Sequence, residues 1–207
     1  MAKQNPATFL PDVATTLNNL ANLHNDTNEM AIALSEYREA LEIYRELVTH
    51  NPATFLPYVA TTLNNLAVLH WNTNEMAIAL SEYQEALQIR RELATHNPST
   101  FLPDVALTLN NLASLHWDTN EMAIALSEYR EALEIYHKLA KQNPATFLPD
   151  VAMTLNNLAS LHSDTNETDL AMSAYQEALQ IYQDFAKKSP AAFQPKVDLV
   201  LKNIAIL

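Results

Sequence analysis

Histidines and asparagines recur at fixed positions in the sequence, each with a spacing of 46 residues. The histidines are His24, His70, His116 and His162. An imidazole can ligate a metal ion or act as a general base, but both roles need further groups placed within reach. No second ligand follows any of the four histidines at the i+4 position. We therefore interpret them as packed core residues rather than as a metal site.

The asparagines lie in adjacent pairs, each in the middle of a stretch with helical periodicity. The pairs are Asn18 and Asn19, Asn64 and Asn65, Asn110 and Asn111, and Asn156 and Asn157. Asparagine is a mediocre helix former whose amide offers two donors and two acceptor sites, so its repetition needs a reason. One interpretation is a ladder of amides that binds a peptide backbone, and the other is a set of bridges between neighbouring helices. We favour the peptide role for the first asparagine of each pair and leave both roles open for the second.

The composition excludes several classes of enzyme. The 207 residues include no glycine, which the phosphate-binding loops GxGxxG and GxxxxGK require. They also include no cysteine, so a thiolate nucleophile and a cysteine-ligated metal centre are excluded. Glu36 and Glu39 are neighbouring carboxylates, but we expect them on an exposed helix rather than in a desolvated cleft. The sequence therefore predicts no enzyme activity, no cofactor and no metal.

The charge and hydropathy limit the partners. The formal net charge of −12 repels nucleic-acid phosphates, and no cluster of lysine and arginine offsets it. No apolar run approaches the roughly 18 residues of a membrane span. The first residues also lack the basic start and apolar stretch of a signal peptide. We expect a soluble, cytoplasmic protein that binds neither nucleic acid nor a membrane.

A repeat of 46 residues accounts for nearly the whole chain. The motif Asn-Pro-Ala-Thr-Phe-Leu-Pro begins at Asn5, and a degraded fifth copy begins at Ser189. A fixed period of this length is typical of solenoids, whose repeats bury their apolar faces against one another. We therefore expect residues 1–207 to form a single repeat domain. Its repeats are 5–50, 51–96, 97–142 and 143–188, and residues 189–207 are a partial fifth repeat with a terminal helix.

Each repeat contains two stretches with the period of an amphipathic helix. In the first repeat Val13, Leu17 and Leu20 share one face, which predicts a first helix, the A helix, over residues 11–27. A continuous apolar stripe then predicts a second helix, the B helix, over residues 29–48. We expect the segment that joins one repeat to the next, such as residues 49–56, to be a tight connector without helix.

The turn between the two helices must reverse the chain without glycine. Asparagine is the residue that best tolerates the left-handed conformation with which many helices end. We assign this position to Asn28 and to its copies Asn74, Asn120 and Asn166.

The stretch Leu17-Asn18-Asn19-Leu20-Ala21, followed by Ala33, Tyr37 and Ala40, resembles the tetratricopeptide repeat. The resemblance is stronger to the longer repeats of kinesin light chains and their bacterial relatives, and it covers essentially the whole chain. It implies an all-α, right-handed solenoid of nine helices in which A/B hairpins stack. It also implies that the A helices line a concave groove that holds an extended peptide.

Two features depart from this family pattern. The turn glycine of the family is Asn28 here, which the preference of asparagine for the left-handed conformation accommodates. The A helices of the four full repeats contain no lysine or arginine, although many such grooves use basic side chains to hold acidic peptides. We therefore expect a neutral or basic ligand.

The positions that vary among the four copies share one face of the A helix, which we name the variable stripe. Trp71 and Trp117 are large apolar rings on this mostly polar stripe, and tryptophan is enriched at binding hot spots. The alternative is that these positions drift because only solvent contacts them. The stripe consists of Asp12, Tyr58, Asp104 and Asp150; Thr15, Thr61, Leu107 and Met153; Asn22, Val68, Ser114 and Ser160; and Asn25, Trp71, Trp117 and Ser163.

The sequence thus predicts a non-catalytic protein-interaction scaffold that binds an extended neutral or basic peptide in the groove. The predicted peptide-binding residues are Asn18, Asn19, Asn22, Asn64, Asn65, Trp71, Asn110, Asn111, Trp117, Asn156 and Asn157. One alternative is a self-assembling structural or spacer array that stacks end to end as a homo-oligomer, because residues 195–207 are apolar nearly all round. Another is a sensor fragment of a larger multidomain protein, because the chain begins part-way through a repeat.

Overall fold

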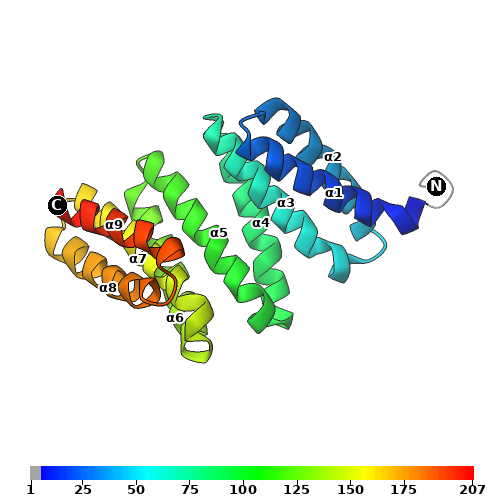
Figure 1. Ribbon diagram of the computed structural model, residues 1–207. Helices are drawn as coiled ribbons and strands as arrows, with labels where there is room; N and C mark the ends of the chain where they lie inside the picture. Colours follow the sequence, from blue (N-terminus) through cyan, green and yellow to red (C-terminus); the bar gives the residue numbers. More distant parts are fainter. Residues whose placement is uncertain (1–5) are drawn as a thin grey trace. The chain divides into compact units, whose positions relative to one another are not determined.

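A computed structural model of the protein describes residues 6–207, which form nine α-helices and no strand (Figure 1). The predicted all-α class is confirmed. The A helices are α1 (Pro6–Asp26), α3 (Pro52–Asn72), α5 (Pro98–Asp118), α7 (Pro144–Asp164) and α9 (Pro190–Ala205). The B helices are α2 (Met30–Val48), α4 (Met76–His96), α6 (Met122–Gln142) and α8 (Thr168–Ala186). Within the described residues, no helix is both long enough and apolar enough to cross a membrane.

The chain divides into two compact units, one extending to Phe101 and the other running from Leu102 to Leu207. The N-terminal unit contains two hairpins, α1/α2 and α3/α4, and α2 also packs against α3. In the C-terminal unit, α6 packs against α7, α7 forms a hairpin with α8, and α8 packs against α9. Three B helices, α2, α6 and α8, therefore contact the A helix that follows them in the chain.

The A helices begin earlier than the sequence indicated, so the prediction of a connector over residues 49–56 is wrong beyond residue 51. Helix α3 begins at Pro52, where the missing N–H of proline costs nothing, and the side chain of Asn51 accepts a hydrogen bond from the Thr54 N–H at 3.3 Å. Pro57 lies inside the helix and removes one backbone bond there. The carbonyl left without that bond belongs to Ala53, which is exposed and can be solvated.

The predicted turn residues adopt the left-handed conformation. The backbone φ angles are 65° at Asn28, 64° at Asn74, 65° at Asn120 and 60° at Asn166. In the first turn the Glu29 N–H donates to the His24 carbonyl at 2.7 Å, and the Asn28 N–H donates to the Asn25 carbonyl at 3.0 Å. These two bonds satisfy carbonyls at the end of the A helix, as in a Schellman motif. The prediction that asparagine replaces the turn glycine is confirmed.

Small side chains lie where the two helices of a hairpin cross. Ala21 on α1 and Ala33 and Ala40 on α2 are completely buried, and they belong to one apolar cluster with Tyr37. Alanine at a crossing lets two helices approach closely, and the tyrosine ring fills the remaining space. This packing positions the tyrosine hydroxyl beneath the variable stripe.

Candidate peptide-binding face of the A helices

The first asparagine of each pair contacts neighbouring helices. The Asn18 side-chain oxygen accepts a hydrogen bond from the Thr62 hydroxyl on α3 at 3.2 Å. Asn64 is only 6% exposed, and its side-chain oxygen accepts from Arg90 Nη1 on α4 at 3.4 Å. Asn110 is only 5% exposed. Asn64 and Asn110 therefore present little surface to a ligand, whereas the sequence favoured these first asparagines for the peptide.

The second asparagine of a pair donates to an amide on the preceding A helix. Asn65 Nδ2 donates to Asn22 Oδ1 at 3.3 Å, and Asn157 Nδ2 donates to Asn110 Oδ1 at 3.4 Å. The partial fifth repeat continues the pattern, because its asparagine donates to Asn156 Oδ1 at 3.1 Å.

The second asparagines of the other two pairs differ in exposure: Asn19 is exposed, and Asn111 is half-buried. An amide has two donor hydrogens and two acceptor sites, so one bond along the ladder leaves further capacity on each side chain. The contacts are those of bridges between A helices, and a peptide-binding role for the same amides stays a prediction. The half-buried Asn65 and Asn157 combine a bridge with surface left for a ligand.

The two tryptophans are half-buried on the variable stripe. Trp117 Nε1 donates to Asp164 Oδ2 on α7 at 2.9 Å, which fixes the orientation of the ring. The ring also packs against an apolar cluster that includes Ala113 and Leu161. Trp117 therefore supports the contact between α5 and α7 and still presents part of its ring to solvent.

Tyr58 is an aromatic member of the variable stripe that the sequence did not place in the binding site. Its ring stacks on the ring of Tyr44, with centroids 5.2 Å apart and planes 19° apart, while 46% of the residue stays exposed. Tyr44 is in turn held by a hydrogen bond between its hydroxyl and that of Thr15 at 2.9 Å. The sequence could have indicated Tyr58 only through the substitution itself, because the other three copies carry aspartate at this position.

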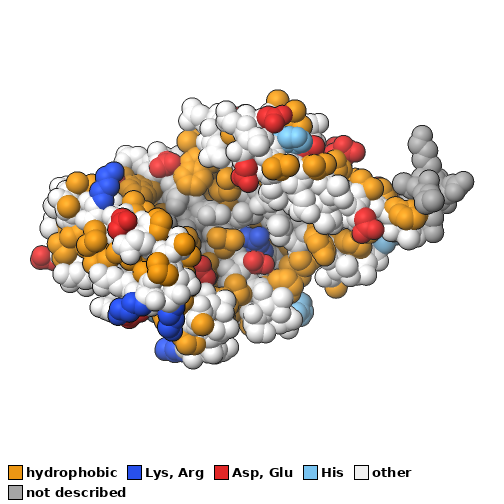
Figure 2. All heavy atoms as spheres, in the orientation of Figure 1, with side chains coloured by type: hydrophobic (Ala, Val, Ile, Leu, Met, Phe, Trp, Pro, Cys, Tyr) orange, Lys and Arg blue, Asp and Glu red, His pale blue; other side chains and the backbone are white. Residues whose placement is uncertain are grey.

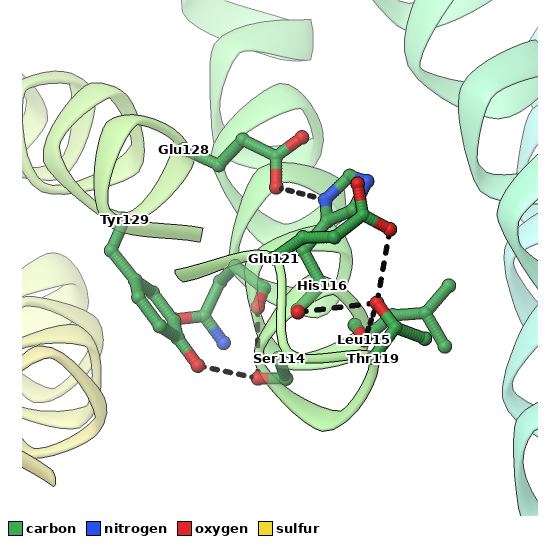
Figure 3. Close-up of polar contacts among 8 residues, drawn as sticks. Ser114, Leu115, His116, Thr119, Glu121, Glu128 and Tyr129 are labelled. Atoms are coloured by element: carbon green, nitrogen blue, oxygen red, sulfur yellow. Dashed lines mark hydrogen bonds and ion pairs between the residues drawn. The ribbon is translucent and has the colours of Figure 1, made fainter. Parts of the chain in front are cut away.

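A buried tyrosine on the B helix bonds to the variable stripe in three of the four repeats. The Tyr37 hydroxyl donates to Asn22 Oδ1 at 2.6 Å. The hydroxyls of Tyr129 and Ser114 lie 2.7 Å apart, and those of Tyr175 and Ser160 lie 2.9 Å apart. Figure 3 shows Tyr129 reaching from α6 to Ser114 on α5.

The second repeat lacks this bond. Val68 stands where the other repeats carry Asn22, Ser114 or Ser160. The Tyr83 hydroxyl is buried and has no hydrogen-bond partner among the residues that the structure describes. Burial raises the pKa of Tyr83. It also raises the pKa of Tyr37 to about 12.

Each of the four recurring histidines bonds to a carboxylate. In Figure 3 His116 Nδ1 faces Glu128 Oε2, at 2.7 Å, across the α5/α6 hairpin. His24 makes the same contact with Glu36 at 2.7 Å, and His70 makes it with Glu82 at 2.8 Å. The expectation that Glu36 is an exposed surface residue is therefore wrong, because the closed hairpin brings it against an imidazole.

The histidine in the fourth repeat uses a different carboxylate. Ala174 replaces the B-helix glutamate there, and His162 Nδ1 instead contacts Glu167 Oε2 in the turn at 2.5 Å. The His162 hydrogen bond is the largest influence on Glu167, and it lowers the pKa of that carboxyl. Within residues 6–207 no group of three or more histidine, aspartate or glutamate side chains is placed to hold a metal ion. The histidines link the A helix to the following turn or helix; His70, His116 and His162 are buried, and His24 is half-buried.

Acidic side chains are the only charged groups on the variable stripe of α1, α3, α5 and α7. Asp12 is exposed, and Asp150 is half-buried. Burial raises the pKa of Asp150, and the Lys196 ammonium on α9 opposes that rise. In the view of Figure 2 basic side chains gather mainly over the α6 to α9 end of the chain. The face carries negative charge beside aromatic rings that are exposed or half-buried.

These hairpins define an all-α protein built from helical repeats. Models of the tetratricopeptide repeat match residues 13–52, 58–138 and 104–184. The chain therefore belongs to the tetratricopeptide repeat family. No curated protein sequence matches the chain.

Solved structures share the fold at low sequence identity. BtubC (BKLC) from P. vanneervenii is 24% identical, with a TM-score of 0.70 over 99% of this chain and 82% of that one. Aspartyl phosphate phosphatase F from Bacillus subtilis is 14% identical, with a TM-score of 0.73 over 92% of this chain and 44% of that one. The Rap conjugation gene regulator of plasmid pLS20, in complex with the Phr* peptide, is 14% identical, with a TM-score of 0.68 over 92% of this chain and 46% of that one. The chain spans less than half the length of the last two proteins.

Proposed function

We propose that the protein is an interaction scaffold that binds an extended neutral or basic peptide along the A-helix face of each unit. The observation that carries the proposal is the set of exposed or half-buried aromatic rings on the variable stripe. Trp71 and Tyr58 lie on α3, and Trp117 lies on α5. The proposal involves binding without a catalytic step.

Two of these rings are held in place before any ligand arrives. Tyr58 is stacked on Tyr44, and Trp117 is oriented by Asp164. A side chain that is already ordered loses little conformational freedom on binding, so its contact area contributes more to affinity. Tryptophan and tyrosine are also the side chains most often found at binding hot spots.

The polar groups beside the rings support a ligand in extended form. Asn65 and Asn157 each retain amide capacity beyond the bond to the preceding A helix. An amide can bond a peptide backbone whatever side chains the peptide carries. The peptide bound by the plasmid pLS20 regulator is a precedent within the same fold for a peptide ligand.

Selection from a displayed library of random linear peptides tests this function. We expect selected peptides to be enriched in lysine, arginine and apolar residues. Replacing Trp71 and Trp117 together with alanine should then weaken binding of a selected peptide by more than about 1 kcal/mol, which is roughly a fivefold loss of affinity. Titration calorimetry with the wild-type chain and the double variant measures the change.

The matched control is Ile78→Ala, which removes an exposed apolar side chain from a B helix. This variant should bind the same peptide as the wild-type chain does. Enrichment of acidic peptides, or equal affinity in the double tryptophan variant, contradicts the proposed face.

A second candidate function is end-to-end assembly into an array. It is favoured by helix α9, where Leu199 and Leu201 are exposed, and by the exposed Ile206 that follows it. Contacts between unlike ends of two copies grow into rings or filaments rather than closed dimers. Sedimentation that shows species growing with concentration supports this candidate, and a strict monomer at high concentration contradicts it.

A further inference from the structure

An open groove lies where the end of α8 meets the beginnings of α7 and α9. Its apolar lining includes Leu148 of α7, Phe185 of α8 and Phe193 of α9. Its volume of about 760 Å³ lies within the roughly 300–1,000 Å³ that is typical of pockets for small organic ligands. The three helices belong to one compact unit, in which α8 packs against both of the others. None of the lining residues belongs to the variable stripe, so the groove is a separate candidate site.

The apolar wall of the groove is aromatic. Phe185 is half-buried and stands where the first three repeats carry leucine. Its ring packs against that of Phe193, with centroids 5.1 Å apart and planes tilted by 50°. In the first repeat the equivalent residue, Leu47, is only 6% exposed and belongs to a buried apolar cluster against which Leu10 and Phe55 pack. Aromatic surface therefore lines the groove where the first repeat has a buried leucine.

The edge of the groove is basic, although the formal net charge of the chain is −12. Lys187 and Lys188 line this edge together with one acid, Asp184. Lys187 Nζ lies 2.7 Å from Asp184 Oδ1, and this hydrogen bond is the main cause that lowers the pKa of the Asp184 carboxyl. In Figure 2 basic side chains lie beside hydrophobic side chains around the end of α8. The lysines outnumber the aspartate, so the edge favours an anion.

The sequence of the fourth repeat combines the aromatic wall with the basic edge, and the sequences of the other three do not. In the first two repeats threonine and histidine stand at the positions of Lys187 and Lys188. The third repeat has Lys141 at the first of these positions, but its leucine, Leu139, is only 6% exposed. A hydroxyl adjoins the lysines in the fourth repeat, because Ser189 also lines the groove. Among the described residues, its side chain makes no capping bond to the first turn of α9.

We propose that this groove binds a small organic anion with an aromatic body, of the class of aryl carboxylates. The aromatic part packs against Phe185 and Phe193 in the offset or edge-to-face geometries that ring pairs prefer. The anionic group lies at the edge formed by Lys187 and Lys188, and the Ser189 hydroxyl donates a hydrogen bond to it. This ligand is opposite in charge to the basic peptide proposed for the A-helix face, so the two sites select different molecules.

Titration of the full chain with two fluorescent probes tests the proposal. One is anilinonaphthalene sulfonate, and the other is phenylnaphthylamine, which has the same rings without the charge. We expect saturable binding of the sulfonate with one molecule per chain. The double variant Lys187→Thr, Lys188→Gln should weaken the sulfonate about fivefold and leave the affinity of the uncharged probe unchanged. Phe185→Leu should weaken both probes about fivefold, because it removes ring contact from each.

Asp184→Asn should tighten sulfonate binding, because it removes the carboxylate that competes with the probe for Lys187. A variant that merely disturbs the groove would not strengthen binding. The threonine, glutamine and leucine of the other variants each stand at the same position of another repeat, so these variants should fold. Circular dichroism checks the helix content and thermal unfolding of each one.

The matched control is Lys141→Thr, which makes the same change at the equivalent position of the third repeat and should leave both affinities unchanged. Absence of sulfonate binding, binding that the double lysine variant does not change, or an equal loss in Lys141→Thr overturns the proposal. A dimer that the sulfonate dissociates, as seen by sedimentation, also overturns it, because a second copy then occupies the groove. So does displacement of the probe by an acidic, phenylalanine-containing peptide at a lower concentration than naphthalene carboxylate requires.

Discussion

The α3/α4 and α5/α6 hairpins bury a tyrosine at the same position and treat its hydroxyl in opposite ways. The Tyr129 hydroxyl lies 2.7 Å from that of Ser114, whereas the Tyr83 hydroxyl, in the repeat where Val68 replaces that serine, has no partner among the described residues. Both rings are completely buried. The difference shows that the hairpin requires the tyrosine ring, while the bond to its hydroxyl depends on a residue that varies between repeats.

The comparison also links the interior of the hairpin to its surface. Ser114 and Val68 belong to the variable stripe, where we propose that peptides bind. An apolar residue in the stripe of the second repeat adds to the surface of Trp71 and Tyr58, but it leaves a buried polar group unsatisfied. An unsatisfied buried hydroxyl costs about 1–3 kcal/mol. The second repeat is therefore less stable than it would be if the same packing left no buried hydroxyl unsatisfied.

Alkaline pH should produce the largest loss in the free energy of unfolding, because it acts on buried tyrosines in several hairpins together. Burial raises the pKa of Tyr129 to about 12, although the Ser114 hydroxyl opposes the rise. An unfolded tyrosine ionises near pH 10. The stabilising contribution is complete below about pH 10 and is lost as pH rises through about 12, because only the unfolded chain releases the proton in that interval.

Urea unfolding at a series of pH values from about 9 to 12 measures this loss, and tyrosinate absorbance follows the ionisation. A free energy of unfolding that stays constant over the interval contradicts the prediction. Full ionisation of the tyrosines in a chain that is still folded at about pH 11 contradicts it as well.

Both hairpins share a hydrogen bond between a histidine of the A helix and a glutamate of the B helix. His116→Ala should be the most damaging single substitution in this contact. It removes a buried imidazole together with its hydrogen bond to the half-buried Glu128 carboxylate. We expect a loss of about 2–4 kcal/mol in the free energy of unfolding. The exposed His50 is the control, because His50→Ala should change stability by less than about 0.5 kcal/mol. Equal effects of the two substitutions would show that the buried link contributes nothing.

Ser114→Val should convert the α5/α6 hairpin to the state of the α3/α4 hairpin. The Tyr129 hydroxyl then loses its partner, and we expect a loss of about 1–3 kcal/mol in urea unfolding. Ser127→Val, at an exposed position of α6, controls for the change in helix propensity. If Ser114→Val is no more destabilising than the control, the hydrogen bond between Ser114 and Tyr129 makes no net contribution to the free energy of unfolding.

Val68→Ser should make the reverse change and have the smallest effect. The serine supplies a partner to Tyr83 but gives up apolar packing, so the informative comparison is with Val68→Ala. We expect the serine variant to be more stable than the alanine variant by about 1 kcal/mol. That difference should vanish when Tyr83 is replaced by phenylalanine, as a double-mutant cycle can measure. A difference that persists in the phenylalanine background contradicts the explanation that the serine acts through the Tyr83 hydroxyl.

Local rules were sufficient to predict most of the helices and turns. The apolar period predicted both helices of each repeat, and the preference of asparagine for positive φ correctly identified Asn28 and its copies. The start of the A helix was mispredicted because two prolines lie five residues apart. The first is compatible with a helix start, and the second suggested a boundary that the structure does not have.

The contacts of the candidate site could be predicted less well. Glu36 lies 12 residues from His24 and meets it only when the hairpin closes. Tyr58 was recognisable as a variable position, but its ordered ring depends on stacking against Tyr44 of another helix. Similarly, bridges between A helices were one of two interpretations of the asparagines, and the partner of each amide depends on how the hairpins stack.

Burial separates what the sequence determined from what the tertiary structure decided. The sequence determined the repeat, the helix pairs and the turn asparagines, because these depend on interactions between residues close along the chain. It could not distinguish Leu20 from Leu66, which stand in nearly identical helices. Only the tertiary structure exposes one and buries the other, because burial depends on whether a B helix packs against that face.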